Sequence, residues 1–535
     1  MAKYVKQIVF DTEARDKLLT GINVVAKAVG STLGPRGRNV AVDITPNYDV
    51  SPTILHDGVS VARSINLEDV HEDMGARLIK SAALRTNQTA GDGTTTSTIL
   101  AQAIIQEAHK VVQSGINPMQ IKKEIEEASK EVLDKLKSMA KKITTDKETE
   151  QIATISAADV EIGKLVAQAL GKVGKEGVLT VEEGKNLGTT VDYKQGMQID
   201  KGYLSPYFVT DQERVESIIP DPHILLTDRT IQYSHEILPL LERFVKETGS
   251  KNLVIFAGGV IEEAMATLVA NKLRGLINVC AIQAPAFGGR RTDELEDMAT
   301  LIGGVPILFD SGREISSVEI GELGRADKII ADRDKTIVLN GHGDPKGIAN
   351  RIKDLQKQID ISNTDFDSEI KKERLANLAG SIAVINVGAV TEVEMKEKKE
   401  RVIDAIAATK AAIDEGIVAG GEITLLNLAS QASEMPSEGF SVGRHILLSA
   451  LKAPFKKLVE NAGIDYADAL QKLTGKDYPI GIDVIDGETK DLIEAGIIDP
   501  VLVTRSALQN AVSVATMIIT TDCLITDVPS EDLSK

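Results

Sequence analysis

The spacing of apolar residues along this 535-residue chain changes twice, and that change constrains the fold more than any single motif. Helical spacing covers 11–31, 74–114 and 119–142, and it returns at 346–380 and from 396 onward. Between about 175 and 345, helical stretches alternate with short Val, Ile and Leu runs, at 252–256, 276–282, 305–309 and 336–339. Alternating strands and helices build α/β layers, so the pattern predicts a multidomain α/β protein with a central α/β unit inserted in mainly helical surroundings. Val- and Ile-rich segments at 38–44 and 53–63 predict two further strands.

Charge and cysteine content exclude several function classes. Lys and Arg number 61 against 79 Asp and Glu, and the net charge of −18 argues against nucleic acid or an anionic membrane as partner. The two cysteines, Cys280 and Cys523, form no CxxC motif, which indicates a reducing compartment. The charged N-terminal segment does not resemble a secretory signal, and no window approaches about 18 uninterrupted apolar residues. We therefore expect a cytoplasmic location and no membrane span.

The strongest local motif is the GDGTTT loop, Gly91 to Thr96, directly before an apolar helix. Its glycines allow backbone N–H groups to approach an anion, its three hydroxyl groups add donors, and a helix N-terminus favours negative charge. Asp92 could hold Mg²⁺ beside phosphate oxygens. The alternative is a threonine-rich helix cap after a glycine turn, and the motif alone leaves both interpretations open.

Three other features are weaker by themselves. Thr32-Leu33-Gly34-Pro35 follows a helix and predicts either a phosphate loop or an ordinary helix stop. Asp57 ends a predicted strand, where a turn and a catalytic carboxylate are both common. Asp404 lies among apolar residues of a predicted helix at 396–415, which fits partial burial or a role toward a partner. The sequence contains no Walker A, GxGxxG or HExxH motif.

Several blocks taken together resemble the signature motifs of the group I chaperonins, the GroEL family. They occur in order along nearly the whole chain: TLGPRGRNV (32–40), DGVSVA (57–62), AGDGTTTSTILAQAI (90–104), GYLSPYF (202–208), TEVEMKEKKER (391–401), EGIVAGG (415–421) and IIDPVLVTRSALQ (497–509). The resemblance implies an equatorial ATPase domain (1–138 and 415–535), an intermediate hinge domain (139–194 and 383–414) and an apical α/β domain (195–382).

The resemblance also implies a site for ATP, Mg²⁺ and K⁺ in the equatorial domain. Asp57 and Asp404 match the two carboxylates that activate the attacking water, Asp92 matches the Mg²⁺ ligand, and Thr32 and Thr95 match positions near K⁺. The implied nucleotide contacts are Thr32, Leu33, Gly34, Pro35, His56, Asp92, Gly93, Thr94, Thr95, Thr96, Gly421, Asp483, Val484, Ile485 and Asp499.

In the apical domain the resemblance implies an exposed apolar groove for non-native polypeptides, although core packing would explain any one of its residues. The implied groove residues are Tyr203, Tyr207, Phe208, Leu238, Leu241, Met265 and Val269. The expected function is an ATP-driven folding chamber: a homo-oligomer of seven-membered rings, stacked in pairs, closed by a GroES-like co-chaperonin. A bacterial-type cytoplasmic location is expected, with an organelle matrix as the alternative.

The chain departs from the family pattern near the implied site. His56 stands where family members usually have Lys, Glu422 replaces the last residue of a Gly triplet, and Asp483 replaces a common Asn. An insertion at 45–51 lengthens a loop, and the usual Gly-Gly-Met tail is not found at 529–535. None of these changes removes an implied catalytic carboxylate. A scaffold that binds proteins without cycling and an unrelated phosphate-transfer enzyme are the competing hypotheses.

Overall fold

The computed structural model describes residues 6–43, 53–143, 145–157, 159–174, 177–184, 188–212, 214–361, 365–433 and 441–527. The insertion at 45–51 and the residues 529–535 lie outside this described part. The chain forms two compact units. Unit 1 comprises 1–171, 181–190 and 386–535, and unit 2 comprises 172–180 and 191–385. The division into three domains stays a prediction.

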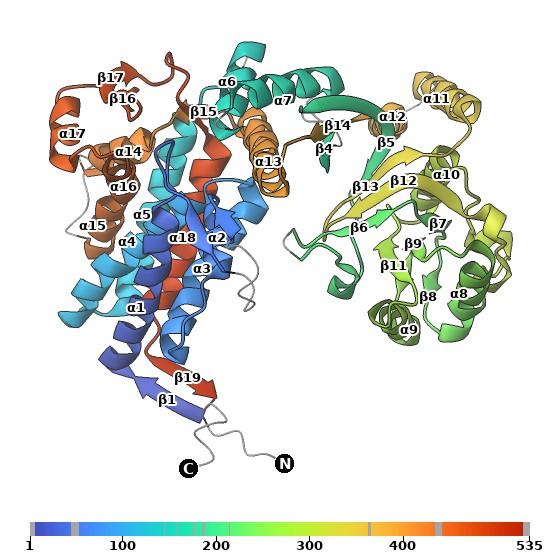
Figure 1. Ribbon diagram of the computed structural model, residues 1–535, viewed down its shortest axis with the longest axis horizontal. Helices are drawn as coiled ribbons and strands as arrows, with labels where there is room; N and C mark the ends of the chain where they lie inside the picture. Colours follow the sequence, from blue (N-terminus) through green and yellow to red (C-terminus); the bar gives the residue numbers. More distant parts are fainter. Residues whose placement is uncertain are drawn as a thin grey trace. The chain divides into compact units, whose positions relative to one another are not determined.

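Unit 1 is mainly helical (Figure 1). Its helices are α1 (Asp11–Gly30), α2 (Gly58–Ser64), α3 (Val70–Ala90), α4 (Thr94–Gln113), α5 (Pro118–Ser138), α6 (Asp146–Ala157), α7 (Val160–Val173), α13 (Glu392–Glu415), α14 (Ile423–Ser433), α15 (Val442–Ala450), α16 (Ala453–Asn461), α17 (Tyr466–Leu473) and α18 (Val501–Ile519). Short antiparallel strand pairs complete it: β1 (Lys6–Phe10) with β19 (Cys523–Asp527), β2 (Val40–Val42) with β3 (Thr53–Leu55), β15 (Ile417–Ala419) with β18 (Ile498–Pro500), and β16 (Ile480–Asp483) with β17 (Glu488–Asp491).

The core of unit 1 lies between α1, α3, α4, α5 and α18, which come from both ends of the chain. Within the described residues, α18 alone is long and apolar enough to cross a membrane, but 67% of its apolar window is buried inside the protein. Burial of this kind is typical of the central helix in the core of a folded protein.

Unit 2 is built on a mixed sheet with the strand order β11-β9-β7-β12-β13-β5-β14-β4, and β6 also pairs with β12. β7, β9 and β11 run parallel, while β12 and β13 run antiparallel to their neighbours. The strands are β4 (Val178–Glu183), β5 (Thr190–Ile199), β6 (Ser217–Pro220), β7 (His223–Leu226), β8 (Thr230–Ile231), β9 (Asn252–Ala257), β10 (Gly259–Val260), β11 (Asn278–Gln283), β12 (Gly324–Ala331), β13 (Thr336–Gly341) and β14 (Ser381–Val387).

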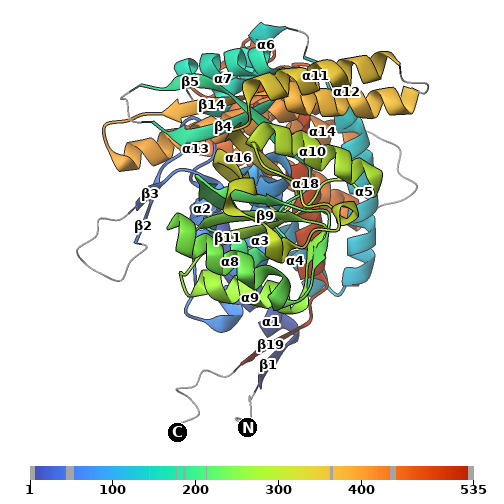
Figure 2. The same ribbon diagram turned by 90° about the vertical axis from the view of Figure 1, so that its right-hand side faces the viewer.

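The helices of unit 2 pack on this sheet and supply much of its apolar core. Figure 2 shows α11 and α12 lying side by side, and both helices fall within the segment 346–380, where the spacing predicts helix. The helices are α8 (Ser234–Thr248), α9 (Glu262–Leu273), α10 (Gly289–Ile302), α11 (Pro345–Asp360) and α12 (Asp365–Ala379), with short 3-10 turns at Pro206–Phe208, Phe309–Ser311, Ile315–Ser317 and Ile320–Glu322.

One predicted strand is shorter than expected and another is absent from the described residues. In the segment 53–63 only Thr53–Leu55 is extended, and α2 begins at Gly58 because the Asp57 side chain accepts a hydrogen bond from the backbone N–H of Ser60 and caps a helix. The segment 305–309 forms no strand; it makes one isolated bridge, between Thr227 and Ile307, and then enters a 3-10 turn. In both segments the apolar run is so short that the spacing of its residues does not distinguish a strand from a helix or a loop.

Candidate functional site

The GDGTTT loop joins α3 to α4 through two glycines with positive φ. Gly91 (φ 72°) ends α3, and Gly93 (φ 80°) precedes the first residue of α4. Side chains rarely adopt this backbone region, so the sharp turn requires glycine at both positions. Between them, Asp92 accepts a hydrogen bond of 2.5 Å from the backbone N–H of Gly93. The turn therefore places a carboxylate and three threonines at a helix N-terminus.

Asp57 is held beside this loop by close packing of α2 against α4. A Cβ added at Gly58 would overlap the Oγ1 of Thr95 and would lie 3.0 Å from the Oγ1 of Thr94. Asp57, the residue before Gly58, caps α2 with a bond of 2.8 Å from the N–H of Ser60. The structure thus brings the predicted catalytic carboxylate next to the predicted phosphate loop.

The second glycine loop lies against the first. The hydroxyl groups of Thr32 and Thr95 are 3.3 Å apart, and Thr32 also donates to the carbonyl of Val29. Asn461 fixes the loop by donating to the carbonyls of Gly30 and Leu33, at 3.0 Å each. The four predicted residues from Thr32 to Pro35 are therefore held beside Thr95.

Three carboxyl groups gather beside the GDGTTT loop. Burial raises the pKa of Asp92, and the charge of Asp57 raises it further. Burial raises the pKa of Glu422 to about 7, and it raises the pKa of Asp499 well above its ordinary value, with added repulsion from Glu422 and Asp92. Asp499 is positioned by β18, which pairs with β15, and a Cβ on Gly420 would lie 3.0 Å from its Oδ1.

This acidic group fits a cation. Among the residues that the structure describes, no Lys, Arg or His pairs with Asp92, Glu422 or Asp499, and no group of three His, Cys, Asp or Glu is arranged as a metal cage. Mg²⁺ is often held by one or two protein carboxylates together with phosphate oxygens rather than by a protein cage. The donor set therefore suits Mg²⁺ bound with a phosphate ligand, with Asp92 as the carboxylate nearest the loop amides.

Asp404 reaches this region on α13. A Cβ added at Gly91 would overlap the Cβ of Ala407, so α13 packs directly on the GDGTTT loop. Asp404 precedes Ala407 by three residues, which places the two on one face of the helix, and its side chain is half-buried between the buried Val402 and Ala405. Asp404 therefore lies on the face of α13 that packs on the loop, and its side chain is partly buried, as one of the two sequence interpretations expects.

The remaining predicted nucleotide contacts are more scattered. Val484 is buried in a small core with Leu492, and Gly421 (φ 61°) packs against the same leucine, whereas Ile485 is 62% exposed. Asp483 forms an ion pair of 2.8 Å with Lys490.

His56 is exposed, and its Nδ1 lies 2.9 Å from the Oδ1 of Asn39. Within the described part of the chain, neither His56 nor Asp483 bonds to the GDGTTT loop.

Sequence reasoning missed three residues that shape the site. The Ser156 side chain of α6 lies close enough to Asp92 to lower the pKa of its carboxyl. Asn461 fixes the second glycine loop, and the hydroxyl of Tyr478 accepts from the N–H of Ala419, 2.9 Å away, which holds the turn before Glu422. Single polar residues inside ordinary helices and turns carry no motif, so no sequence signal could have found them.

The predicted apolar groove in unit 2 is only partly exposed. Tyr207 is 66% exposed and Leu238 is 39% exposed. In contrast, Tyr203, Phe208 and Leu241 are buried, so their predicted exposure is wrong: they belong to the apolar core of unit 2. Met265 and Val269 are partly buried against that core. Further exposed apolar residues of unit 2 are Tyr233, Ile261, Leu273 and Leu276.

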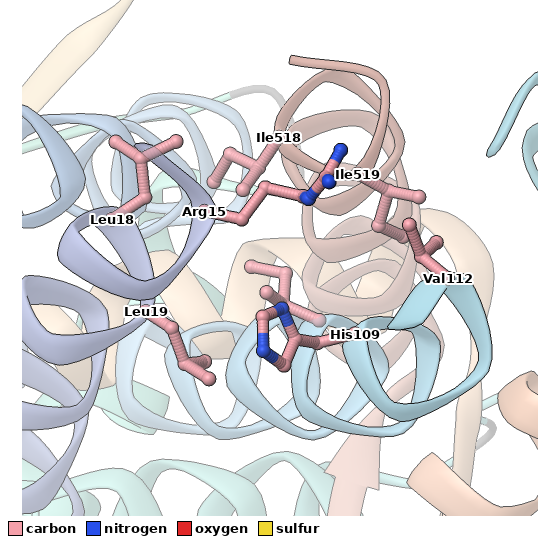
Figure 3. Close-up of a pocket in the computed structure, with 8 residues that line it drawn as sticks. Arg15, Leu18, Leu19, His109, Val112, Ile518 and Ile519 are labelled. Atoms are coloured by element: carbon pink, nitrogen blue, oxygen red, sulfur yellow. The ribbon is translucent and has the colours of Figure 1, made fainter. Parts of the chain in front are cut away.

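A small cavity in unit 1 is separate from these features. Figure 3 shows it between α1, α4 and α18, with Arg15 and His109 among its lining residues. Its volume of about 20 Å³ is enough for about one water molecule. It therefore offers no room for a nucleotide or a peptide.

The fold and the site together define a multidomain α/β protein with a glycine- and threonine-rich loop beside partly buried carboxylates. A family model of the TCP-1/cpn60 chaperonin family matches residues 25–529. The chain belongs to this chaperonin family, which confirms both the family recognition and the predicted fold class.

Solved structures agree with this assignment at the level of the fold. Two crystal forms of the chaperonin gp146 from the bacteriophage EL 2 (Pseudomonas aeruginosa), both in presence of ATP-BeFx, match with TM-scores of 0.67 and 0.62. Sequence identity is 21% and 20%, and each match covers 97% of this chain and 99% of the other.

Proposed function

We propose that this protein is an ATP-driven chaperone, a ring-shaped chamber that binds non-native polypeptides and promotes their folding. The observation that carries the proposal is the acidic group beside the GDGTTT loop in a chain that belongs to the chaperonin family over residues 25–529. The similar phage chaperonin was crystallised in presence of ATP-BeFx, which supports a nucleotide as the ligand of this site.

The residues divide into binding and activating groups. The amides at the start of α4 and the hydroxyls of Thr94 and Thr95 would bind the phosphates, and Asp92 would hold Mg²⁺, which would supply charge neutralisation at the phosphate oxygens. Thr32 and Thr95, whose hydroxyls meet, are the candidates for K⁺ coordination. Asp57 and Asp404 orient the attacking water, and Asp404 accepts its proton as the general base. Because Asp404 comes from α13 and Asp57 from the cap of α2, hydrolysis requires both elements in place.

Exposed apolar residues of unit 2 support the polypeptide-binding part of the proposal. Tyr207 and Leu238 are the exposed members of the predicted groove, and apolar surface of this kind binds non-native chains and the mobile loop of a partner. The complete proposal is a homo-oligomer of seven-membered rings in stacked pairs with a GroES-like co-chaperonin.

The decisive test is Asp404→Ala. We expect ATP binding within a few-fold of the unaltered protein, and hydrolysis slower by about a hundredfold or more, because loss of a general base typically costs at least that factor. Asp414→Ala is the matched control, since Asp414 is an exposed acid on the same helix. Near-normal turnover in Asp404→Ala would remove Asp404 from the mechanism.

Electron microscopy with and without ATP tests the assembly. A folding chamber forms rings that change shape with nucleotide, whereas a scaffold that does not cycle keeps one ring shape. Monomers in both conditions would overturn the chamber proposal.

A further inference from the structure

Glu422 has a backbone conformation that favours glycine. Its φ is 59°, directly after Gly421 at φ 61°. A side chain in this left-handed region is strained, and a glycine would remove that strain. Strain of this kind at a binding loop indicates that the side chain contributes something the backbone alone cannot.

The Glu422 side chain is bonded to the GDGTTT loop. Its Oε1 accepts a hydrogen bond of 2.6 Å from the hydroxyl of Thr96, which lies in the first turn of α4. The bond joins the turn after β15 to the predicted phosphate-binding helix end. While Glu422 is ionised, the Thr96 proton is directed at the carboxylate and is not available to a phosphate.

The charges around Glu422 all have the same sign. Asp92, from the α3–α4 loop, is the charged group that acts on the Glu422 pKa, Glu422 in turn raises the pKa of Asp499 on β18, and no cation pairs with any of the three in the described part of the chain. A bare nucleotide phosphate would therefore add negative charge to an uncompensated acidic group. A divalent cation that enters with the nucleotide would reverse that repulsion.

We propose that Glu422 is a positioning and specificity residue that orients Thr96 and restricts the site to nucleotide accompanied by a divalent cation. The inference rests on the proposed nucleotide site and adds a role for a residue outside the pair of carboxylates proposed to activate water. If Glu422 had only a structural role, replacing it would change the affinity for nucleotide equally with and without the metal. In the proposed role, replacing it changes mainly the affinity for metal-free nucleotide.

The test is isothermal titration calorimetry with ADP at pH 8, above the Glu422 pKa of about 7, once with Mg²⁺ and once with EDTA. Glu422→Gln removes the charge and keeps an acceptor for Thr96, so we expect metal-free ADP to bind about tenfold or more tightly while MgADP changes less than about threefold. Glu422→Gly removes the charge and relieves the backbone strain. It should raise the ratio of metal-free to Mg²⁺-bound ADP affinity in the same direction. Glu494→Gln, at an exposed acid, is the control and should change neither affinity.

The outcomes separate this inference from the proposed function. If the unaltered protein binds neither form of ADP, the nucleotide site itself is wrong. If it binds MgADP and the ratio of metal-free to Mg²⁺-bound affinity is the same in Glu422→Gln and Glu422→Gly as in the unaltered protein, the role of Glu422 is refuted and the nucleotide site stands.

Discussion

Replacing Gly91 by alanine should separate α13 from the GDGTTT loop. Two effects add at this position. The φ of 72° costs an alanine about 1–2 kcal/mol, and the new Cβ overlaps the Cβ of Ala407, an overpacking that typically costs about 1–3 kcal/mol. The expected loss of stability is therefore about 2–5 kcal/mol. Gly91→Ala should also slow ATP hydrolysis, because α13 carries Asp404.

A control and a rescue divide this loss into its parts. Gly115 has a φ of 94° and no heavy atom within 4 Å of an added Cβ, so Gly115→Ala should cost only the backbone strain, about 1–2 kcal/mol. Ala407→Gly removes the overlapping atom and by itself costs about 1 kcal/mol of helix propensity. In the double variant Gly91→Ala/Ala407→Gly the overpacking cost should disappear, a coupling of about 1–3 kcal/mol.

Urea denaturation followed by circular dichroism measures these differences. All variants are compared at one protein concentration, because assembly shifts apparent stability. The reasoning is refuted if Gly91→Ala is no more destabilising than Gly115→Ala, or if Ala407→Gly restores nothing in the double variant. Either result would mean that α13 does not pack on the loop and that Asp404 lies elsewhere.

Three other predictions follow from exposure and from an ion pair. Tyr207→Glu should fold and assemble but lose capture of an unfolded test protein, whereas Leu241→Glu should fail to fold because Leu241 is 4% exposed; equal folding of both would contradict the burial pattern. His56→Ala should change ATP hydrolysis less than threefold, about 0.7 kcal/mol, in a steady-state assay, and a larger loss would show that the side chain binds phosphate. Glu322 has its pKa lowered from 4.5 to about 2, chiefly by its bond with Arg313, so its stabilising contribution is full above about pH 4.5 and is lost as pH falls toward 2. Glu322→Gln should lower the urea midpoint at pH 7 and converge with the unaltered protein in acid; a constant difference would refute the assignment.

The sequence by itself determined the local structure and the family. The glycines of the GDGTTT loop predict a sharp turn before α4, and the structure has that turn with positive φ at Gly91 and Gly93. The helical spacing predicts α1, α4 and α5 closely. These features depend on residues within a few positions of each other, where backbone preference and apolar period decide the outcome.

Only the tertiary structure decided which residues meet and which are covered. Thr96 and Glu422 are 326 positions apart, and no local pattern connects them. In the same way, Tyr203 and Phe208 belong to an aromatic segment that suggests an exposed groove, yet they are buried while Tyr207 is exposed. Burial and long-range contact depend on how helices and sheet pack together, which the spacing of residues along one segment does not specify.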